Sequence, residues 1–111
     1  MQDRIKKFLA PLPVTEMLVP DSAKVQDTVA VYLKAEAPNG CWKFIIFNVD
    51  QKGSFSYEAS ALGAYEGFGI CPAVWVTRDT TIDILPGEKG TFIFTANENG
   101  FRILADTLVV Y

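Results

Sequence analysis

The side chains that could carry chemistry in this sequence are two cysteines, Cys41 and Cys71, and scattered carboxylates, because the chain contains no histidine. Histidine is the commonest general base and a frequent metal ligand, so histidine-based catalytic triads are excluded. A cysteine nucleophile would lack an activating base, and two cysteines cannot form a structural zinc site without further ligands. We therefore expect no catalytic residue, no metal site and no cofactor, and we predict that the protein is not an enzyme.

The two cysteines are placed where they could meet. Cys41 opens an apolar run, and Cys71 ends a glycine-containing segment, residues 62–71, that we expect to be a loop. If this loop folds back, a Cys41–Cys71 disulfide closes about thirty residues and stabilises the fold by about 3–4 kcal/mol. The alternative is a pair of buried thiols that act as small hydrophobic side chains. We favour the disulfide, which indicates an oxidising compartment.

Aromatic residues in and after the same segment are the candidates for ligand binding. Tyr65 and Phe68 lie among glycines, and Trp75 follows closely. Such side chains can stack on a sugar ring or fill a pocket of a protein partner. The simpler interpretation is that Tyr65 and Phe68 cover the open end of the core. We expect Trp42 and Trp75 to pack in the core, because both lie within apolar runs.

The longest apolar run, residues 41–50, is rich in aromatic and β-branched residues, which predicts a long strand. Its apolar residues fall on both faces, so we expect this strand to be central and covered on both sides. One face would carry Cys41, Ile45, Phe47 and Val49, and the other Trp42, Phe44 and Ile46. Residues 28–37 alternate instead, which predicts one solvated face and one buried face with Val29, Val31, Leu33 and Ala35.

Turns that contain proline, glycine and asparagine divide the rest of the chain into short strands, about seven or eight in all. Residues 1–10 are compatible with one turn of helix. The pattern predicts an all-β fold, a sandwich of two antiparallel sheets. We assign residues 1–13 to an N-terminal lead-in segment and residues 14–111 to a single domain. Residues 14–19 and 101–111 are the candidate edge strands.

Charge and hydropathy argue against two kinds of interaction. The net charge is −3, and no basic cluster is larger than Arg4, Lys6 and Lys7, so nucleic acid is not an expected partner. No apolar run approaches the roughly 18 residues of a membrane-spanning helix. This chain also carries no export signal, since the apolar run at residues 8–14 is short and interrupted by Pro11 and Pro13.

Several turns and strand openings resemble those of a known family. They are Gln26-Asp27-Thr28-Val29, Pro38-Asn39-Gly40-Cys41, Gly69-Ile70-Cys71-Pro72, Leu85-Pro86-Gly87, Gly90-Thr91-Phe92 and Asp106-Thr107-Leu108-Val109-Val110. Across residues 14–111 the chain resembles immunoglobulin-like β-sandwich domains of bacterial secreted and lipid-anchored cell-envelope proteins, many of unknown function. Two features differ from antibody-type domains. The cysteines do not lie on the second and sixth strands, and Phe92 stands where a tyrosine corner needs a hydroxyl.

The resemblance and the cysteine pair imply an extracytoplasmic protein, in the periplasm or at the cell surface. We expect a non-enzymatic structural or ligand-presenting module of a cell-envelope protein, present as a monomer. One alternative is a carbohydrate-binding module that uses Tyr65, Phe68 and Trp75. Another is a protein–protein interaction domain that pairs through an edge strand.

Overall fold

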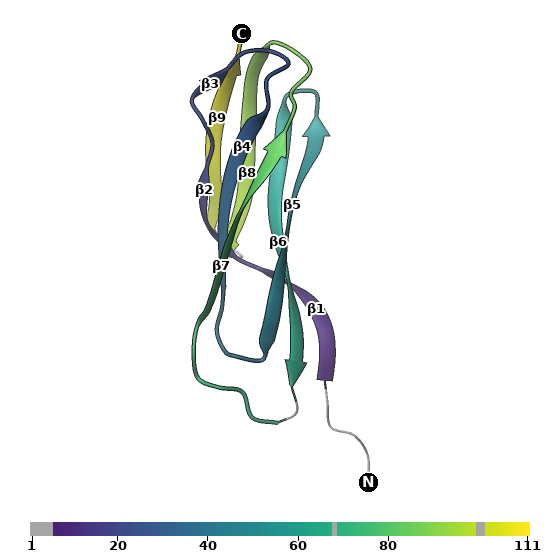
Figure 1. The fold of residues 1–111 in the computed structure, drawn as a ribbon, viewed down its shortest axis with the longest axis vertical. Coiled ribbons are helices and arrows are strands. Elements are labelled where there is room, and N and C mark those ends of the chain that lie inside the picture. Colours follow the sequence, from purple (N-terminus) through teal and green to yellow (C-terminus); the bar gives the residue numbers. More distant parts are fainter. Residues whose placement is uncertain (1–5, 68, 100–101) are drawn as a thin grey trace.

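The computed structural model describes residues 6–67, 69–99 and 102–111, and these residues form nine β-strands in two sheets (Figure 1). The strands are β1 (Lys6–Leu12), β2 (Val14–Leu18), β3 (Ser22–Ala23), β4 (Val29–Ala37), β5 (Trp42–Gly53), β6 (Ser56–Gly67), β7 (Val76–Ile84), β8 (Gly90–Asn99) and β9 (Arg102–Val110). The predicted all-β sandwich is confirmed. Phe68 lies outside the described residues, so its expected role stays a prediction.

Strand β6 lies at the centre of the larger, six-stranded sheet and pairs with three other strands. It pairs with β5 from Ser56 to Tyr65. On its opposite edge it pairs first with β8, at residues 56–59, and then with β1, at residues 61–67. The β6–β8 and β3–β9 pairs are parallel, whereas the sequence led us to expect antiparallel sheets throughout. The β6–β8 pair is parallel because the chain crosses to the other sheet as β7 before it returns.

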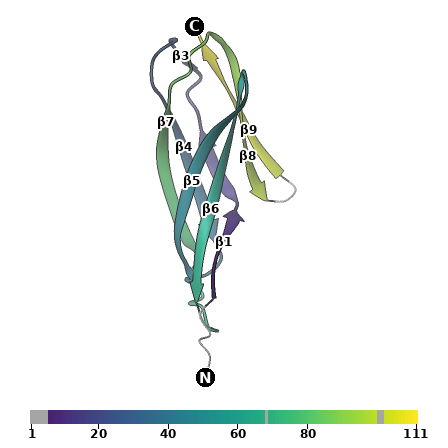
Figure 2. The same ribbon diagram turned by 90° about the vertical axis from the view of Figure 1, so that its right-hand side faces the viewer.

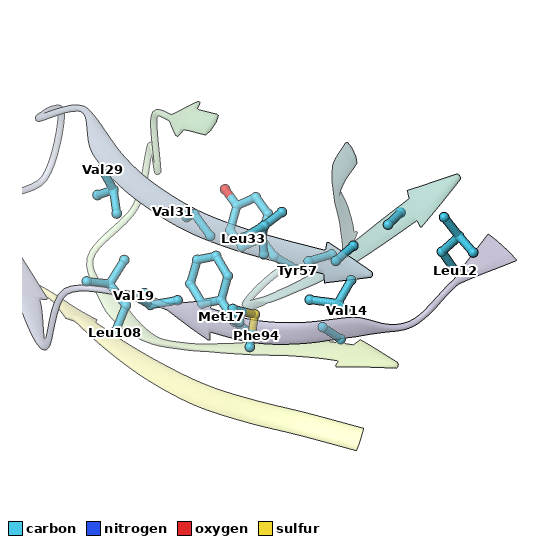
Figure 3. Packing of buried hydrophobic residues seen from close by; sticks show 14 of the residues in the cluster. Leu12, Val14, Met17, Val19, Val29, Val31, Leu33, Tyr57, Phe94 and Leu108 are labelled. Atoms are coloured by element: carbon cyan, nitrogen blue, oxygen red, sulfur yellow. The ribbon is translucent and has the colours of Figure 1, made fainter. Parts of the chain in front are cut away.

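The smaller sheet, with the order β2-β4-β7, supplies one wall of the core through β4. The buried face of β4 predicted from alternation is confirmed for Val29, Val31, Leu33 and Ala35. These side chains pack toward Tyr57 of β6, Phe94 of β8 and Leu108 of β9 (Figure 3). The rings of Tyr57 and Phe94 are stacked, with centroids 5.0 Å apart. Burial raises the pKa of Tyr57 above its ordinary value.

The N-terminal segment is extended, so the expectation of a helical turn at residues 1–10 is wrong for the part that the structure describes. Strand β1 pairs with β6 in the larger sheet, and β2 pairs with β4 in the smaller one. Pro13 lies between the two strands, where the chain changes sheets. Pro11 and Pro13 oppose helix formation and favour extended backbone in the residues before them. Leu12 and Val14 on either side are buried in the core.

The prediction that residues 41–50 form a central strand is wrong. Among the described residues, β5 pairs with β6 alone and is an edge strand of the larger sheet. Ile45, Phe47 and Val49 face inward and are half-buried, whereas Phe44 and Ile46 face outward and are exposed. A bulge between Trp42 and Phe44 places Trp42 on the inward face, not on the outward face expected from strict alternation.

The expected loop at residues 62–71 is also wrong for most of its length. Strand β6 continues to Gly67 through the segment expected to be a loop, so Tyr65 belongs to a strand. Gly63 permits this packing, because a Cβ atom there would lie 2.7 Å from Cε3 of Trp42 and closer still to the Leu12 side chain. Strand β7 is continuous from Val76 to Ile84.

The sandwich is narrow and long, with principal extents of 61 × 21 × 21 Å. Figure 1 shows β1 near one end of the long axis and the end of β9 near the other. In the part of the chain that the structure describes, no helix has the length and apolar character needed to cross a membrane.

We expect Phe94→Ala to lower the free energy of unfolding by about 3–5 kcal/mol, because Phe94 is fully buried and its removal leaves a cavity. The adjacent exposed residue of the same strand gives a matched control, and Ile93→Ala should cost less than about 1 kcal/mol. Urea unfolding measures both values. Equal losses for the two variants would contradict the assignment of the inward face of β8.

Candidate functional site

A disulfide joins Cys41, just before β5, to Cys71, in the segment between β6 and β7, and their Cα atoms are 5.2 Å apart. Two backbone hydrogen bonds hold the same region. The N–H of Gly40 donates to the carbonyl of Pro72 (2.9 Å), and the N–H of Glu66 donates to the carbonyl of Cys41 (2.8 Å). The start of β5, the end of β6 and the segment that leads to β7 are therefore fastened together.

Three aromatic rings from different strands pack beside this disulfide. Phe8 of β1 stacks on Tyr65 of β6, with ring centroids 4.6 Å apart. Trp42 of β5 meets both rings edge to face, at 5.7 Å from Phe8 and 5.3 Å from Tyr65. The Tyr65 hydroxyl lies 3.1 Å from Sγ of Cys71. Phe8 therefore covers one face of the Tyr65 ring, and the Tyr65 hydroxyl is engaged by the disulfide.

The candidate ligand-binding residues do not form one described platform. Tyr65 is half-buried in the cluster above, and Phe68 lies outside the described residues. The indole of Trp75 is 70% exposed, so the expectation that Trp75 packs in the core is wrong. No aromatic pair among the described residues includes Trp75. Trp42, by contrast, is half-buried and packs against the core as expected.

One side of the sandwich is open, where β5 and β7 run alongside each other as edges of the two sheets (Figure 2). A groove of about 320 Å³ lies between these edges. It is lined by Phe44, Ile45 and Phe47 of β5 and by Arg78, Asp79, Thr80 and Ile82 of β7. We call it the β5–β7 groove. Its β5 wall is apolar, and its β7 wall mixes apolar and polar side chains.

The polar residues of the β7 wall belong to opposite faces of the strand. Arg78 pairs with buried Ala35 and Thr80 with buried Leu33, so both lie on the inward row of β7. Asp79 lies on the other face, where its carboxylate accepts a hydrogen bond of 2.9 Å from the Tyr32 hydroxyl. This hydrogen bond raises the pKa of Tyr32 above its ordinary value. A cation thus lies on the core-facing row of an edge strand.

A strip of apolar side chains covers the outward face of β1, β6 and β5. Ala64 of β6 lies between Leu9 of β1 and Phe44 of β5, and Leu62 pairs with Ile46. Leu9 is 58% exposed, Phe44 55% and Ile46 48%. This outward strip borders the free edge of β5, so a molecule that approached the edge would meet apolar surface on both faces of the strand.

The site offers hydrogen-bonding backbone, apolar surface, the cation of Arg78 and the carboxylate of Asp79, a combination suited to binding. Within residues 6–67, 69–99 and 102–111, no group of three or more Cys, Asp or Glu side chains is positioned to hold a metal ion. Within residues 6–67, 69–97 and 103–111, no polar or charged side chain is fully buried.

The fold defines the class of the protein as an all-β sandwich of two sheets. Comparisons with protein-family models, with curated proteins and with solved structures found no match. Sequence reasoning missed the β5–β7 groove because it placed β5 in the centre of a sheet. One signal was present: Val76, Arg78, Thr80, Ile82 and Ile84 alternate as an inward row that contains a charge, which is typical of an edge strand.

We expect the oxidised protein to be lighter by two hydrogens than the reduced protein when its mass is measured without reductant. The double variant Cys41→Ser/Cys71→Ser should lose about 3–4 kcal/mol of unfolding free energy, because the disulfide limits the unfolded chain. Urea unfolding of the reduced wild type is the matched control and should agree with the double variant. Two free thiols on the native protein would contradict the disulfide.

Proposed function

We propose that this chain is a non-enzymatic extracytoplasmic module that binds a protein partner by accepting an extended segment along the free edge of β5. The observation that carries the proposal is the position of β5. The most apolar run of the chain forms a 12-residue strand whose second edge pairs with no other described strand. An added strand would satisfy the backbone groups along that edge and cover apolar side chains on both faces.

A long, apolar, unpaired strand edge promotes aggregation unless a binding partner covers it. Natural sheets protect their edges with short strands, prolines, charges or covering segments, because a long apolar edge invites pairing with other chains. The part of β5 from Phe44 to Phe47 contains no proline and no charge. In this respect it differs from β1, which contains Pro11, and from β9, which β3 covers at Val109 and Val110. A binding role explains why the edge of β5 is left open.

The disulfide supports the extracytoplasmic part of the proposal, because disulfides persist in oxidising compartments. It joins the start of β5 to the segment before β7, and so it fixes the spacing of the two edges that line the groove. The resemblance to immunoglobulin-like domains of cell-envelope proteins points to the same compartment. We therefore place the module in the periplasm or on the cell surface.

Carbohydrate binding has weaker support. Stacking on a sugar needs an exposed ring face, and of the described candidates only Trp75 is mostly exposed. The stacking of Tyr65 on Phe8 leaves that ring within the aromatic cluster.

We expect peptides of about nine residues, selected from a random displayed library on the oxidised protein, to bind along β5. Hydrogen exchange should show that bound peptide slows exchange of β5 amides. The double variant Phe44→Thr/Ile46→Thr should weaken binding about tenfold, because it removes two exposed side chains that an added strand would cover.

Ile103→Thr is the matched control, since Ile103 is an exposed residue of β9, far from β5 in the sheet order. It should bind the selected peptides as the wild type does. Peptides that protect other strands and bind the double variant with unchanged affinity would contradict the proposed function.

A further inference from the structure

We infer that the β5–β7 groove selects a partner strand that carries a carboxylate on its inward row, with apolar side chains at the neighbouring inward positions. The inference rests on the proposed function, because it specifies the chemistry of the segment that pairs with β5. Its basis is the composition of the groove walls, in which Arg78 lies beside apolar side chains, while the carboxylate of Asp79 is engaged by the Tyr32 hydroxyl.

A strand added to β5 would have its side chains alternate between the two faces of the enlarged sheet. Its inward row would continue the row of Ile45 and Phe47, and it would face β7 across the groove. Ile45, Phe47, Arg78 and Ile82 line the same groove, so they would be the neighbours of that inward row. Every second side chain of the added strand would therefore contact the groove.

Arg78 has unused capacity to bind an anion. Its Nη1 donates to the carbonyl of Thr77 (2.8 Å), which occupies one of the five guanidinium donors. The ion pairs among the described residues join Lys7 to Glu66 and Lys52 to Glu58, and neither includes Arg78. The neighbouring Asp79 also lines the groove, but it belongs to the other row of β7 and its carboxylate accepts a hydrogen bond from the Tyr32 hydroxyl. A carboxylate entering the groove could therefore form a bidentate, hydrogen-bonded ion pair with Arg78.

The rest of the groove favours apolar side chains. Ile82 lies on the same inward row of β7 as Arg78, and both face the half-buried Ile45 and Phe47 of β5. A matching segment would thus place Val, Ile or Leu two or four residues from its Asp or Glu. A basic residue in place of the acid would be repelled by Arg78.

A second copy of this chain fits the groove poorly, so we assign the partner strand to a different protein. In a symmetric pairing of two β5 edges, the entering inward row would be Trp42, Ile45, Phe47, Val49 and Gln51, which contains no carboxylate. Strand β9 does carry Asp106 between Leu104 and Leu108 on its inward row. However, the Asp106 carboxylate already accepts a hydrogen bond of 2.8 Å from the N–H of Thr107, and β3 pairs with the end of this strand at Val109 and Val110.

The test uses the displayed peptides that bind along β5 of the oxidised protein. We expect these peptides to be enriched in Asp or Glu, with apolar residues at alternate positions beside the acid. Arg78→Gln should weaken binding about fivefold, Arg78→Lys should weaken it less, and Lys89→Gln, a change of an exposed cation elsewhere, should have no effect. A double-mutant cycle between Arg78→Gln and Glu→Gln in the peptide should show that the two losses are not additive.

The outcomes separate this inference from the proposed function. Peptides that protect β5 but show no preference for acids, and that bind Arg78→Gln as they bind the wild type, would overturn the inference and leave strand binding in place. Peptides enriched in lysine would overturn it as well. The absence of any peptide that protects β5 would overturn both. Because Arg78 is exposed, the variants should keep the unfolding free energy of the wild type, which urea unfolding checks.

Discussion

Strand β6 uses both of its edges, and this constraint determines where the other strands of the larger sheet can lie. One edge is taken by β5, and the other is shared between β8 and β1. Between Tyr57 and Tyr65 the residues on its inward row are small, with Ala59, Ala61 and Gly63 in succession. Leu12 and Trp42 pack into the space over Gly63. Because β7 joins the other sheet, none of the described strands covers the far edge of β5.

The sequence was informative where structure is set by local pattern. The alternation of residues 28–37 predicted the buried face of β4, and turn residues predicted an all-β fold. It was misleading where structure is set by pairing between distant segments. Apolar residues on both faces of β5 are compatible with a central strand or with an edge strand that has a binding surface. Only the pairing with β6 distinguishes these two arrangements. Likewise, Gly63 and Gly67 resemble loop glycines, although they allow Leu12, Trp42 and the disulfide to pack closely on β6.

The candidate site follows from the same arrangement. The disulfide could be predicted from the sequence, because Cys41 begins an apolar run and Cys71 ends a glycine-rich segment. The groove could not be predicted, because its position depends on which strand edges face each other. The disulfide fixes one end of the open side, and the half-buried Ile45 and Phe47 line its wall. Arg78 gives this apolar groove a charge, which discourages indiscriminate pairing and favours a strand of complementary chemistry. In the proposed complex, Arg78 therefore both discourages pairing with unrelated strands and favours an acidic partner strand.

The account depends on β5 being an edge strand with unpaired backbone groups. Amide hydrogen exchange of the free, oxidised protein tests this most directly, with β4 as the internal reference because it pairs on both sides, with β2 and β7. We predict that alternate amides of β5, those that point away from β6, exchange rapidly while their neighbours are protected, and that the paired amides of β4 are protected throughout. Uniform protection along β5, equal to that of β4, would contradict the account.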